Sequence, residues 1–445
     1  MSELEFTEEQ KNIIKCNDDN IIVSACAGSG KSSTLVEKAL SEITNIKNWK
    51  KLSILTYTNK SKKDLERRLY NEKIIIDTFH GFIYKDIFPF DYEISQNFIE
   101  NFTFRAKTYE EWRNKLYHEN ILVSSSGTND FVMEHTLHLL KKKNLLSYLK
   151  SKYYAIYIDE AQDNNYHQYA LLEEFIKLGI KLLMVGDPNQ TLYQFRGASP
   201  EDFRKYFSDK RFSSFSLTKN FRCHNIIDKI ANSYCFPSSN INDADLGYYL
   251  ILSSNLEKIV STYSNEKIAY LRKANADLSD YSGKFSIIKD LAFNSNVSEI
   301  VKNIVLCLLR FKFQKNYYLY SLFDDLKIDG NIYSSQNQKK LIEFLNFITE
   351  EKSKKILTSF LVLLLLDEYI EEVFSIYIQL VDDPITKNFF NNLSLHITMT
   401  VHSSKGLEFD NVIINKNDFF YRQELQKNNF YVAFTRAKKR IFVIY

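Results

Sequence analysis

Short apolar runs, each followed by a loop and a helical pattern, recur along the first half of the chain. The runs occupy residues 21–23, 52–55, 74–76, 154–158 and 182–185. After the first two of them, helices are predicted over residues 33–40 and 60–69. Strands that alternate with helices in this order predict a parallel sheet with helices on its faces.

A second block of the same kind stands near the C-terminus, with apolar runs at 397–400, 412–414 and 441–445 and a predicted helix over 431–438. Residues between the strand-rich blocks are mainly helical in character, most clearly over 297–311 and 354–378. The pattern predicts an α/β protein of two lobes, each with a helical insertion. The expected boundaries are 1–82 and 151–215 for the first lobe, 83–150 for its insertion, 216–284 and 395–445 for the second lobe, and 285–394 for its insertion.

The composition indicates a globular protein. Of the 445 residues, 44% are hydrophobic and 25% are charged, which supplies packed cores and argues against wholesale disorder. The formal net charge is only +3, so nucleic-acid binding would depend on a local patch and not on blanket positive charge. The longest apolar run, residues 356–366, is too short to span a bilayer.

The cysteines and the N-terminus predict a reducing compartment. The five cysteines form no CxxC pair and show no metal-ligand spacing, so neither a disulfide framework nor a zinc site is predicted. The first residues, MSELEFTEEQ, are acidic and lack the apolar stretch of a signal peptide. We therefore expect a cytoplasmic protein.

Residues 25–32, ACAGSGKS, follow the first apolar run and open a helix, which is the context of a phosphate-binding loop. Small residues let consecutive N–H groups turn toward a phosphate, and the helix N-terminus adds positive potential. In this pattern Lys31 neutralises the β- and γ-phosphates, and the Ser32 hydroxyl binds Mg²⁺. Ala25 stands where such a loop ordinarily begins with glycine.

Asp159 and Glu160 follow the apolar run 154–158. A carboxylate at the end of a buried strand beside the P-loop strand can hold Mg²⁺ through water, and the adjacent Glu can orient or deprotonate the attacking water. An acidic cluster by itself is more often a solvated loop. Downstream of a P-loop, these residues favour nucleotide hydrolysis.

A series of motifs in order gives the chain its resemblance to a UvrD/Rep-type helicase of superfamily one. They are the Q motif at 6–10, Ia at 55–60, Ib at 78–82, III at 185–198, IV at 217–222, V at 400–409 and VI at 431–437, together with the two nucleotide motifs above. The resemblance implies two RecA-like P-loop lobes with parallel sheets, an ATP hydrolase activity with ATP and Mg²⁺ as cofactors, and 3′-to-5′ movement on single-stranded or tailed DNA.

The resemblance also assigns nucleotide roles to residues of this chain. Gln190 would sense the γ-phosphate, Arg222 and Arg436 would reach it as arginine fingers, and Asp159 and Ser32 would hold the metal. Phe221 would stack on adenine, where the family usually has Tyr. The remaining expected ATP-binding residues are Gln10, Ala27, Gly28, Ser29, Gly30, Ser33, Lys38 and Glu408.

A single strand of nucleic acid is held by bases stacked on exposed rings and by donors to phosphate. Phe195 stands where the family commonly has Trp. The residues expected to contact DNA are Tyr57, Asn59, His80, Phe82, Tyr193, Phe195, Arg196, Thr400 and His402. The basic helix over 60–69 and the run 141–143 could follow phosphates, although such charge runs are usually solvated faces.

Residues 187–190, 196–203, 217–224 and 431–445 are also similar to the helicase-like subunit of Gabija anti-phage systems. That similarity implies a nuclease of the OLD family with a TOPRIM domain as partner. Two other functions stay open on the sequence: a stand-alone repair or recombination helicase, and a regulatory ATPase that senses DNA or nucleotide without unwinding. Membrane association is not expected.

Overall fold

The chain divides into two compact units, one formed by Met1–Ile99, Arg105–Glu257 and Ser404–Tyr445 and the other by Glu100–Phe104 and Lys258–Ser403. The computed structural model describes residues 5–47, 49–94, 98–126, 128–194, 197–275, 277–278, 285–288, 293, 297, 299–314, 321–322, 325–326, 354, 358, 362, 367–383, 386–387, 390 and 394–445.

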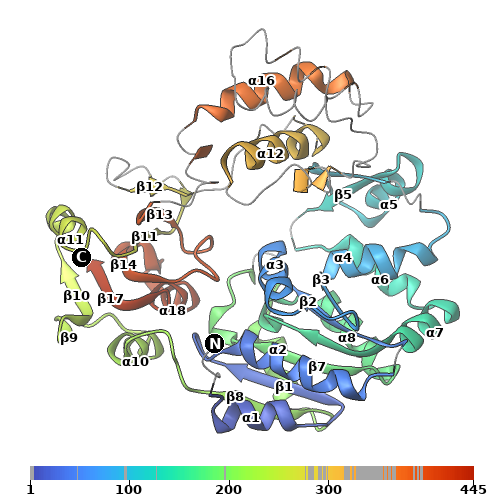
Figure 1. Cartoon of the computed structure of the whole chain (residues 1–445), viewed down its shortest axis with the longest axis horizontal. Helices are drawn as coiled ribbons and strands as arrows, with labels where there is room; N and C mark the ends of the chain where they lie inside the picture. Colours follow the sequence, from blue (N-terminus) through green and yellow to red (C-terminus); the bar gives the residue numbers. More distant parts are fainter. Residues whose placement is uncertain are drawn as a thin grey trace. The chain divides into compact units, whose positions relative to one another are not determined.

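The first unit contains a six-stranded parallel sheet (Figure 1). In spatial order its strands are β3 (Ile74–Thr78), β2 (Lys51–Thr56), β6 (Tyr153–Ile158), β7 (Lys181–Gly186), β1 (Asn20–Ala25) and β8 (Ser213–Leu217). Its helices include α1 (Glu8–Lys15), α2 (Lys31–Glu42), α3 (Asn59–Arg68), α4 (Phe79–Asp86), α8 (Tyr166–Lys177) and α9 (Pro200–Lys205). The predicted strands and the two predicted helices of this block are confirmed.

One expected neighbour relation is wrong. The strand that ends before Asp159 does not lie beside the P-loop strand, because β7 pairs with both β6 and β1 and so separates them. All three strands are parallel, and their carboxyl ends still meet at one edge of the sheet. Ligands of open parallel sheets bind at this edge.

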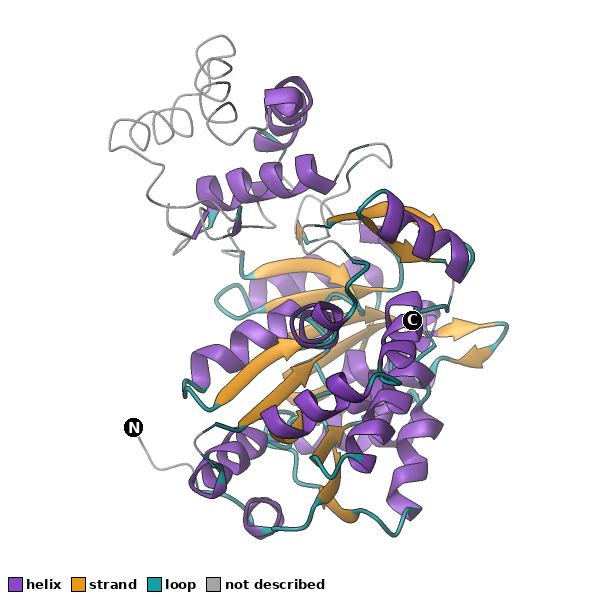
Figure 2. Ribbon diagram, turned by 90° about the vertical axis from the view of Figure 1, so that its right-hand side faces the viewer, coloured by secondary structure: helices purple, strands orange, loops and turns teal. Residues whose placement is uncertain are grey.

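Alternate residues of each central strand face opposite sides, as the period of two requires. In β6, Ile156 and Ile158 belong to one buried cluster, and Ala155 and Tyr157 belong to the other. Both faces of the sheet are therefore covered, which explains why its strands read as continuous apolar runs and not as alternating ones. Figure 2 shows the strands between helices.

The region over 83–150 is only partly helical. It holds α5 (Tyr109–His118), α6 (Phe131–Leu139) and α7 (Lys143–Lys152), but also the strands β4 (Ile99–Ala106) and β5 (Ile121–Ser125). The prediction of a helical insertion over 83–150 missed these two strands, which are rich in Ile, Val, Phe, Thr and Ser, residues that favour extended backbone or lack helix preference.

A second group of strands in the first unit comes from its C-terminal part. β17 (Ala437–Ile444) pairs in parallel with β14 (Phe409–Asn415) and β10 (Leu246–Ile251), and β10 pairs with β9 (Ile241–Asp243) in antiparallel fashion. The helices here are α10 (Asn225–Ser233) and α18 (Lys427–Phe434), and a short hairpin joins β15 (Phe420–Tyr421) to β16 (Glu424–Leu425).

The helix predicted over 431–438 is displaced. The structure ends it at Phe434, because Thr435 closes its last turn and residues from Ala437 onward join β17. The basic residues at 438–440 therefore lie on a strand, not on a helix.

The second unit has β13 (His396–Thr400) paired in parallel with β11 (Ile268–Arg272) and β12 (Ser286–Ile287). The helix α12 (Glu299–Phe313) confirms the pattern at 297–311, and it packs on α16 (Ile370–Val381) through residues such as Val301, Leu308, Val373 and Tyr377. Most of the predicted helix over 354–378 that precedes α16 lies outside the described residues.

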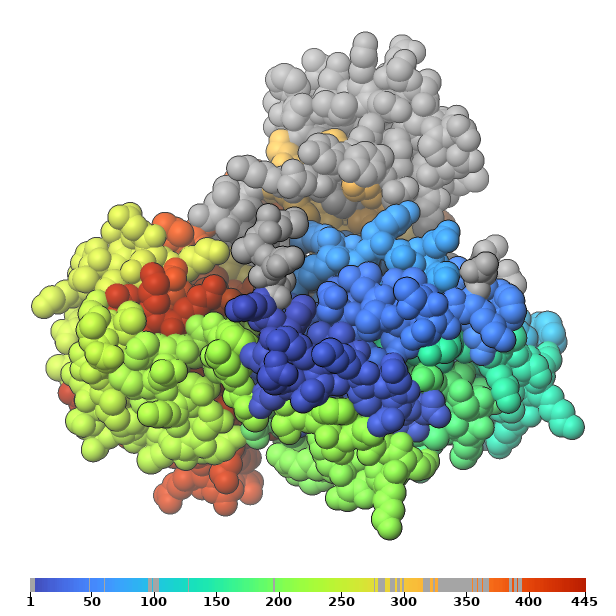
Figure 3. Space-filling model, turned by 60° about the horizontal axis from the view of Figure 1, so that its bottom comes forward, coloured from blue at the N-terminus to red at the C-terminus, as the bar shows by residue number. Residues whose placement is uncertain are grey.

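The N-terminal helix is fixed to the first sheet. The Glu9 carboxylate accepts hydrogen bonds from the backbone N–H (2.8 Å) and the hydroxyl (2.7 Å) of Thr218, just after β8. In Figure 3 the dark blue N-terminal segment lies against green residues of this region. All five cysteines carry free thiols. No helix in the described ranges has the length and apolar character needed to traverse a bilayer.

Candidate nucleotide site

The predicted phosphate-binding loop joins β1 to α2. Gly28 and Gly30 have φ of 69° and 79°, a backbone region that side chains disfavour. A Cβ atom on Gly28 would lie 2.5 Å from both Arg222 Cβ and Asn220 Oδ1. The Phe221 N–H also donates to the Gly28 carbonyl at 2.9 Å. Glycine at position 28 thus lets the segment 220–222 lie directly on the loop.

Gln10 packs against the same loop from α1. Its Oε1 accepts from the Thr7 N–H at 2.8 Å, in a capping box, and its Nε2 donates to the Ser29 carbonyl at 3.1 Å. A Cβ on Gly30 would come within 2.7 Å of Gln10 Nε2. Both ends of the amide are therefore engaged by protein groups beside the phosphate loop.

Asp159 and Glu160 lie where β6 ends, and Glu160 has a left-handed backbone with φ of 56°. Gln162, in the 3₁₀ turn Ala161–Asp163, is fully buried and connects two strand ends. Its Nε2 donates to Glu160 Oε2 at 2.6 Å, and its Oε1 accepts from the Asp187 N–H at 2.9 Å. The sequence analysis gave Gln162 no role, since only the fold brings the two strand ends together.

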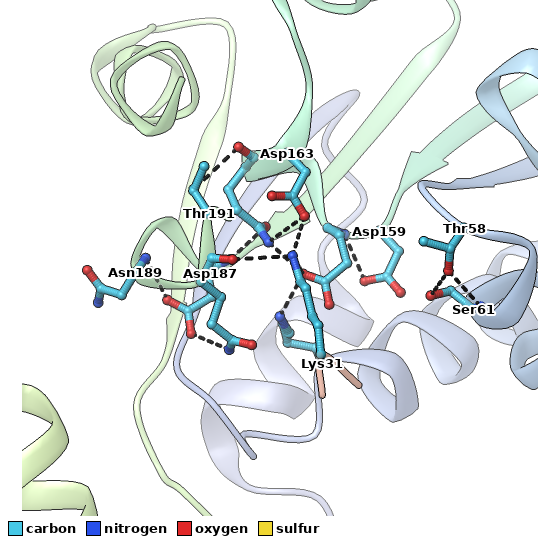
Figure 4. A network of polar contacts seen from close by, with 12 residues as sticks. Lys31, Thr58, Ser61, Asp159, Asp163, Asp187, Asn189 and Thr191 are labelled. Atoms are coloured by element: carbon cyan, nitrogen blue, oxygen red, sulfur yellow. Dashed lines mark hydrogen bonds and ion pairs between the residues drawn. The ribbon is translucent and has the colours of Figure 1, made fainter. Parts of the chain in front are cut away.

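Two lysines face the Glu160 carboxylate. Lys31 Nζ lies 3.3 Å from Glu160 Oε2, and Lys405 Nζ lies 3.9 Å from the same oxygen (Figure 4 shows the surrounding network). Burial would raise the pKa of Glu160, but these two cations and the Gln162 amide hold it well below its usual range. Burial and the neighbouring Glu160 charge raise the pKa of Asp159. The two lysines thus keep the Glu160 carboxylate ionised.

Lys405 lies within motif V, whose pattern predicted no role for it, and the structure gives it three partners besides Glu160. Its ammonium is paired with the buried Asp163, donates to the Gln190 carbonyl at 3.3 Å, and lies 5.4 Å from the centre of the Tyr193 ring. Burial opposes its charge, yet Asp163 and Glu160 raise its pKa. Lys405 is therefore a buried cation at the acidic edge of the site.

Arg436 is a fully buried guanidinium. It donates to the carbonyls of Val432 (3.0 Å) and Leu407 (3.2 Å) and to Gln190 Oε1 (3.2 Å). Among the described residues no carboxylate lies within ion-pair distance of it. Burial, reinforced by the charge of Arg222, lowers the pKa of Arg436 to about 10. A buried cation paired only with neutral oxygens is a strong attractor for an anion.

Arg222 belongs to the same wall of the site. Its Nε donates to Glu408 Oε1 at 2.8 Å, and Glu408 also pairs with Lys438 at 3.0 Å. Burial would raise the pKa of Glu408, but Arg222 and Lys438 lower it. The neighbouring Phe221 ring is 54% exposed, with Lys219 Nζ 4.9 Å from its centre.

Most of these groups border one cavity of about 470 Å³ within the first unit, whereas Gln10, Gln162 and Lys405 are not part of its lining. Its walls combine the phosphate loop, the acidic strand end, one side of α3 and the arginine-bearing segments. The lining residues are Gly28, Ser29, Gly30, Lys31, Ser32, Ser33, Ser61, Asp64, Leu65, Arg68, Asp159, Glu160, Gln190, Phe221, Arg222, Gly406, Glu408, Arg436 and Lys438.

Three predicted nucleotide residues lie just behind this lining. Gln10 is placed as described above, and the buried Ala27 donates its N–H to the Tyr431 hydroxyl at 3.2 Å. Lys38 is buried and donates to the Cys16 carbonyl at 2.5 Å and to Glu42 at 2.7 Å. This placement differs from the nucleotide contact predicted for Lys38. Its charge is neutralised inside the protein, where it connects the end of α1 to α2.

The donor chemistry suits Mg²⁺. Ser32 and Asp159 line the same cavity and offer the hard oxygen ligands that this ion prefers. No group of three or more His, Cys, Asp or Glu residues in the described ranges forms a metal cage. Mg²⁺ at nucleotide sites is ordinarily held by one or two protein oxygens together with phosphates and water, so this sparse donor set fits it.

The charge pattern of α3 suggested that the helix could follow nucleic-acid phosphates, but one side of it lines the nucleotide cavity. Thr58 caps it by accepting from the Ser61 N–H at 3.1 Å, and Ser61 and Arg68 face the nucleotide cavity (the Thr58–Ser61 contact is drawn in Figure 4). The buried Asp77 fixes the helix through Lys62 (2.8 Å) and also binds Lys85 on α4 (2.6 Å). The basic face of α3 is thus partly used within the protein.

Two of the residues predicted to contact DNA form a ring pair. The centres of the Tyr57 and Tyr193 rings are 4.6 Å apart with an angle of 30° between their planes. Asn59 is exposed at the start of α3, and His80 is 48% exposed in its side chain. These four residues follow β2, β3 and β7 at the same edge of the sheet that carries the nucleotide site.

Phe82 does not belong to this group. Its ring is 1% exposed and packs on Tyr153 (5.5 Å) and Phe175 (5.8 Å) in the core, because α4 turns it inward. This burial corrects the expectation of base stacking for Phe82. Thr400 and His402 lie in the second unit, and Phe195 and Arg196 lie outside the described residues.

Comparison with known proteins gives matches over both ends of the chain. Residues 6–108 and 90–211 match the UvrD/REP helicase N-terminal domain, and residues 397–444 match the UvrD-like helicase C-terminal domain. Gabija protein GajB of Bacillus cereus (strain VD045) is 30% identical, with 98% of this chain and 94% of that protein covered.

Two helicases are more distant relatives. The ATP-dependent DNA helicase Rep of Buchnera aphidicola is 24% identical over 59% of this chain and 52% of its own length. A probable DNA helicase II homolog of Mycoplasma pneumoniae is 22% identical over 99% of this chain and 84% of its own length. With the phosphate loop, acidic strand end and arginine wall lining one cavity, these matches show that the chain belongs to the UvrD/Rep family of ATP-dependent DNA helicases.

Proposed function

We propose that this protein hydrolyses ATP with Mg²⁺ to move 3′ to 5′ along single-stranded or tailed DNA in the cytoplasm. We further propose that it is the helicase-like subunit of a Gabija-type anti-phage complex and works with an OLD-family nuclease that carries a TOPRIM domain. The single observation that carries the catalytic part is the convergence of Lys31, Arg222 and Arg436 on one cavity.

The charge of that cavity is arranged for a triphosphate. Arg436 is buried against neutral oxygens, so an anion that enters gains its full attraction without breaking an ion pair. Arg222 and Lys31 are each paired with a glutamate, and these pairs must open or be shared when phosphates arrive. A bound nucleotide would therefore replace these two ion pairs with contacts to its phosphates.

The residues then take these roles. The N–H groups of Gly28 to Ser32 and the Lys31 ammonium hold the β- and γ-phosphates, while Ser32 and Asp159 hold Mg²⁺. Bound Mg²⁺ neutralises charge that develops on the phosphate oxygens. Glu160 orients and deprotonates the attacking water, and Gln190, fixed by Asp187 (2.6 Å) and Arg436, contacts the γ-phosphate.

The base and ribose end of the cavity has the complementary chemistry. Phe221 offers an exposed ring for adenine, and Glu408 offers a carboxylate to the ribose hydroxyls. Gln10 lies behind the loop, and each end of its amide makes one hydrogen bond to the protein, which leaves a second N–H and a second lone pair for the adenine edge. Ala27, Ser29, Gly30 and Ser33 shape the loop around the phosphates.

For the strand, we propose a path over Tyr57, Asn59, His80 and Tyr193, continued by Phe195, Arg196, Thr400 and His402. We propose two RecA-like lobes as the moving parts, the first over 1–82 and 151–215 and the second over 216–284 and 395–445. The segments 83–150 and 285–394 are then their insertions. Arginines supplied from the second lobe couple closure of the lobes to hydrolysis.

The lengths over which the related chains match this one support the Gabija assignment. The similarity to GajB extends over nearly the full length of both chains, whereas the similarity to Rep covers about half of Rep. A chain that works alone as a repair helicase would be active without any partner. The assignment therefore requires a test of partnership as well as of chemistry.

The chemistry is tested by measuring ATP turnover of the full chain with single-stranded DNA, duplex DNA, RNA or no nucleic acid. Lys31→Ala should lower kcat by at least about 10³-fold with an unchanged melting temperature, because the transferring phosphoryl loses its main counter-charge. Wild-type turnover in Lys31→Ala would refute the catalytic assignment. Turnover stimulated by RNA and not by DNA would refute the proposal that DNA is the nucleic-acid substrate.

Polarity and partnership need separate assays. Unwinding should occur on duplexes with a 3′ tail and not with a 5′ tail; strong DNA-stimulated turnover without unwinding would favour the sensing ATPase. Co-expression with the proposed OLD-family nuclease should give a co-purifying complex in which the Lys31→Ala chain abolishes protection from phage. A chain fully protective without a nuclease would overturn the Gabija assignment.

A further inference from the structure

Lys405 touches both the hydrolysis site and the ring pair. It lies in the turn that precedes β14, and its side chain is only 12% exposed. The ammonium is paired with Asp163 and lies 3.9 Å from Glu160 Oε2, while the Tyr193 ring centre is 5.4 Å away. One buried charge is thus shared between the two acids and one aromatic ring.

The ring end of this contact belongs to the proposed path of the strand. The Tyr193 ring lies against the Tyr57 ring, with the ring centres 4.6 Å apart, so the ring that Lys405 faces is also the ring that a nucleobase would use. A cation near a ring is held by the electron density of the ring face, and this attraction is strong when both are desolvated. A base that stacks on Tyr193, or that displaces Tyr57 from it, changes what Lys405 faces.

The acidic end of the contact controls Glu160. In the structure Glu160 has two cations, Lys31 at 3.3 Å and Lys405 at 3.9 Å. When Lys31 turns to a phosphate, Lys405 becomes the cation that remains beside the glutamate. The Oδ1 atom of Asp163 is buried without a hydrogen-bond partner. The ion pair between Asp163 and Lys405 can therefore become stronger or weaker as the ammonium shifts. The position of Lys405 therefore decides how tightly Glu160 is held.

We propose that Lys405 is a positioning residue through which DNA at the Tyr57–Tyr193 pair stimulates hydrolysis at Glu160. This inference rests on the proposed function. In it, a ring pair that holds no base leaves Lys405 shared among Tyr193, Asp163 and Glu160. A base at the pair shifts the ammonium, and Glu160 then aligns with the attacking water. Lys405 itself touches neither nucleotide nor strand.

The test compares Lys405→Met, which keeps the length and removes the charge, with Lys405→Arg, which keeps the charge. In Lys405→Met the stimulation of kcat by oligo-dT should fall by roughly tenfold, as expected for a desolvated cation–ring contact. The affinity for fluorescein-labelled oligo-dT and the KM for ATP should change by less than about threefold. Lys405→Arg should keep part of the stimulation.

Lys152 supplies a matched control. It also pairs with a buried aspartate, Asp86, and lies near two tyrosine rings, Tyr148 (5.3 Å) and Tyr153 (5.4 Å), but not at the cavity. Lys152→Met should lower the melting temperature and leave the stimulation ratio at the wild-type value. A merely structural role of Lys405 would give the same result as this control.

Three outcomes would overturn the inference. They are wild-type stimulation in Lys405→Met, an equal loss of basal and stimulated turnover, and loss of oligo-dT affinity large enough to explain the lost stimulation. Should Lys405→Met fail to fold, Tyr193→Leu combined with Lys405→Arg tests the same coupling. If the double variant loses stimulation by the sum of the two single losses, expressed as free energies, Tyr193 and Lys405 act independently and the coupling is refuted. If Lys31→Ala keeps turnover, the proposed function itself fails first.

Discussion

Gly28→Ala is the substitution whose effect is best defined by the structure. An alanine here would need φ near 69°, which costs about 1–2 kcal/mol for a residue with a side chain. Its Cβ would also lie 2.5 Å from Arg222 Cβ and Asn220 Oδ1. Relief of this overlap, an overpacking cost of about 1–3 kcal/mol, requires the segment 220–222 to move by roughly 1 Å.

The expected loss of stability is therefore about 2–5 kcal/mol, or roughly 4–20 °C in the melting temperature of a unit of this size. Hydrolysis should suffer more. The movement carries Arg222 away from the cavity, and a misplacement of about 1 Å at a catalytic group can cost about 10²-fold in rate. The assay is a thermal melt together with steady-state ATP turnover of the full chain.

Gly179→Ala isolates the backbone cost. Gly179 has nearly the same conformation, with φ of 72°, but nothing lies within 4 Å of a Cβ built on it, and it ends α8 away from the cavity. We expect a loss of about 1–2 kcal/mol and wild-type turnover for this variant. Equal melting temperatures and equal turnover in the two variants would refute the close approach of segment 220–222 to the loop.

Two further predictions concern the base end of the cavity and the support of α3. Phe221→Ala should raise the KM for ATP about tenfold with kcat changed less than about threefold, because stacking on a ring contributes roughly 1–3 kcal/mol. Phe221→Tyr should restore the KM. An equal rise in KM in both variants would exclude stacking on this ring. Burial raises the pKa of Asp77, but Lys62 and Lys85 lower it overall, so its stabilisation is present at neutral pH and is lost as pH falls below the usual aspartate range. The melting temperatures of wild type and Asp77→Asn should differ at pH 6 and should converge only as pH falls below about 4; a constant difference would contradict this linkage.

The sequence predicts the chemistry of the site well where that chemistry is local. A phosphate loop is a strand, a tight turn and a helix within a dozen residues, so Lys31 and Ser32 are recognisable without any tertiary information. The same holds for Asp159 and Glu160 behind an apolar strand. Such motifs are short because the chain itself delivers their residues to one place.

Residues that act on these motifs from elsewhere are not predictable in the same way. Gln162 joins the ends of β6 and β7, and Lys405 reaches Glu160 from more than 240 positions away in the chain. Neither has a local pattern that separates it from an ordinary polar residue. Phe82 shows the converse: it follows a strand as a base-contacting ring would, but α4 turns it into the core.

By itself, then, the sequence determined which residue types could bind a triphosphate and that a parallel sheet would present them, because strand periodicity and loop chemistry are properties of neighbouring residues. Only the tertiary structure decided that β7 stands between β6 and β1, that Arg436 is buried against the neutral oxygens of Val432, Leu407 and Gln190, and that Lys405 bridges Tyr193 and Glu160. Burial and long-range pairing depend on how whole elements pack, and the charge of a group in a low-dielectric interior follows from that packing.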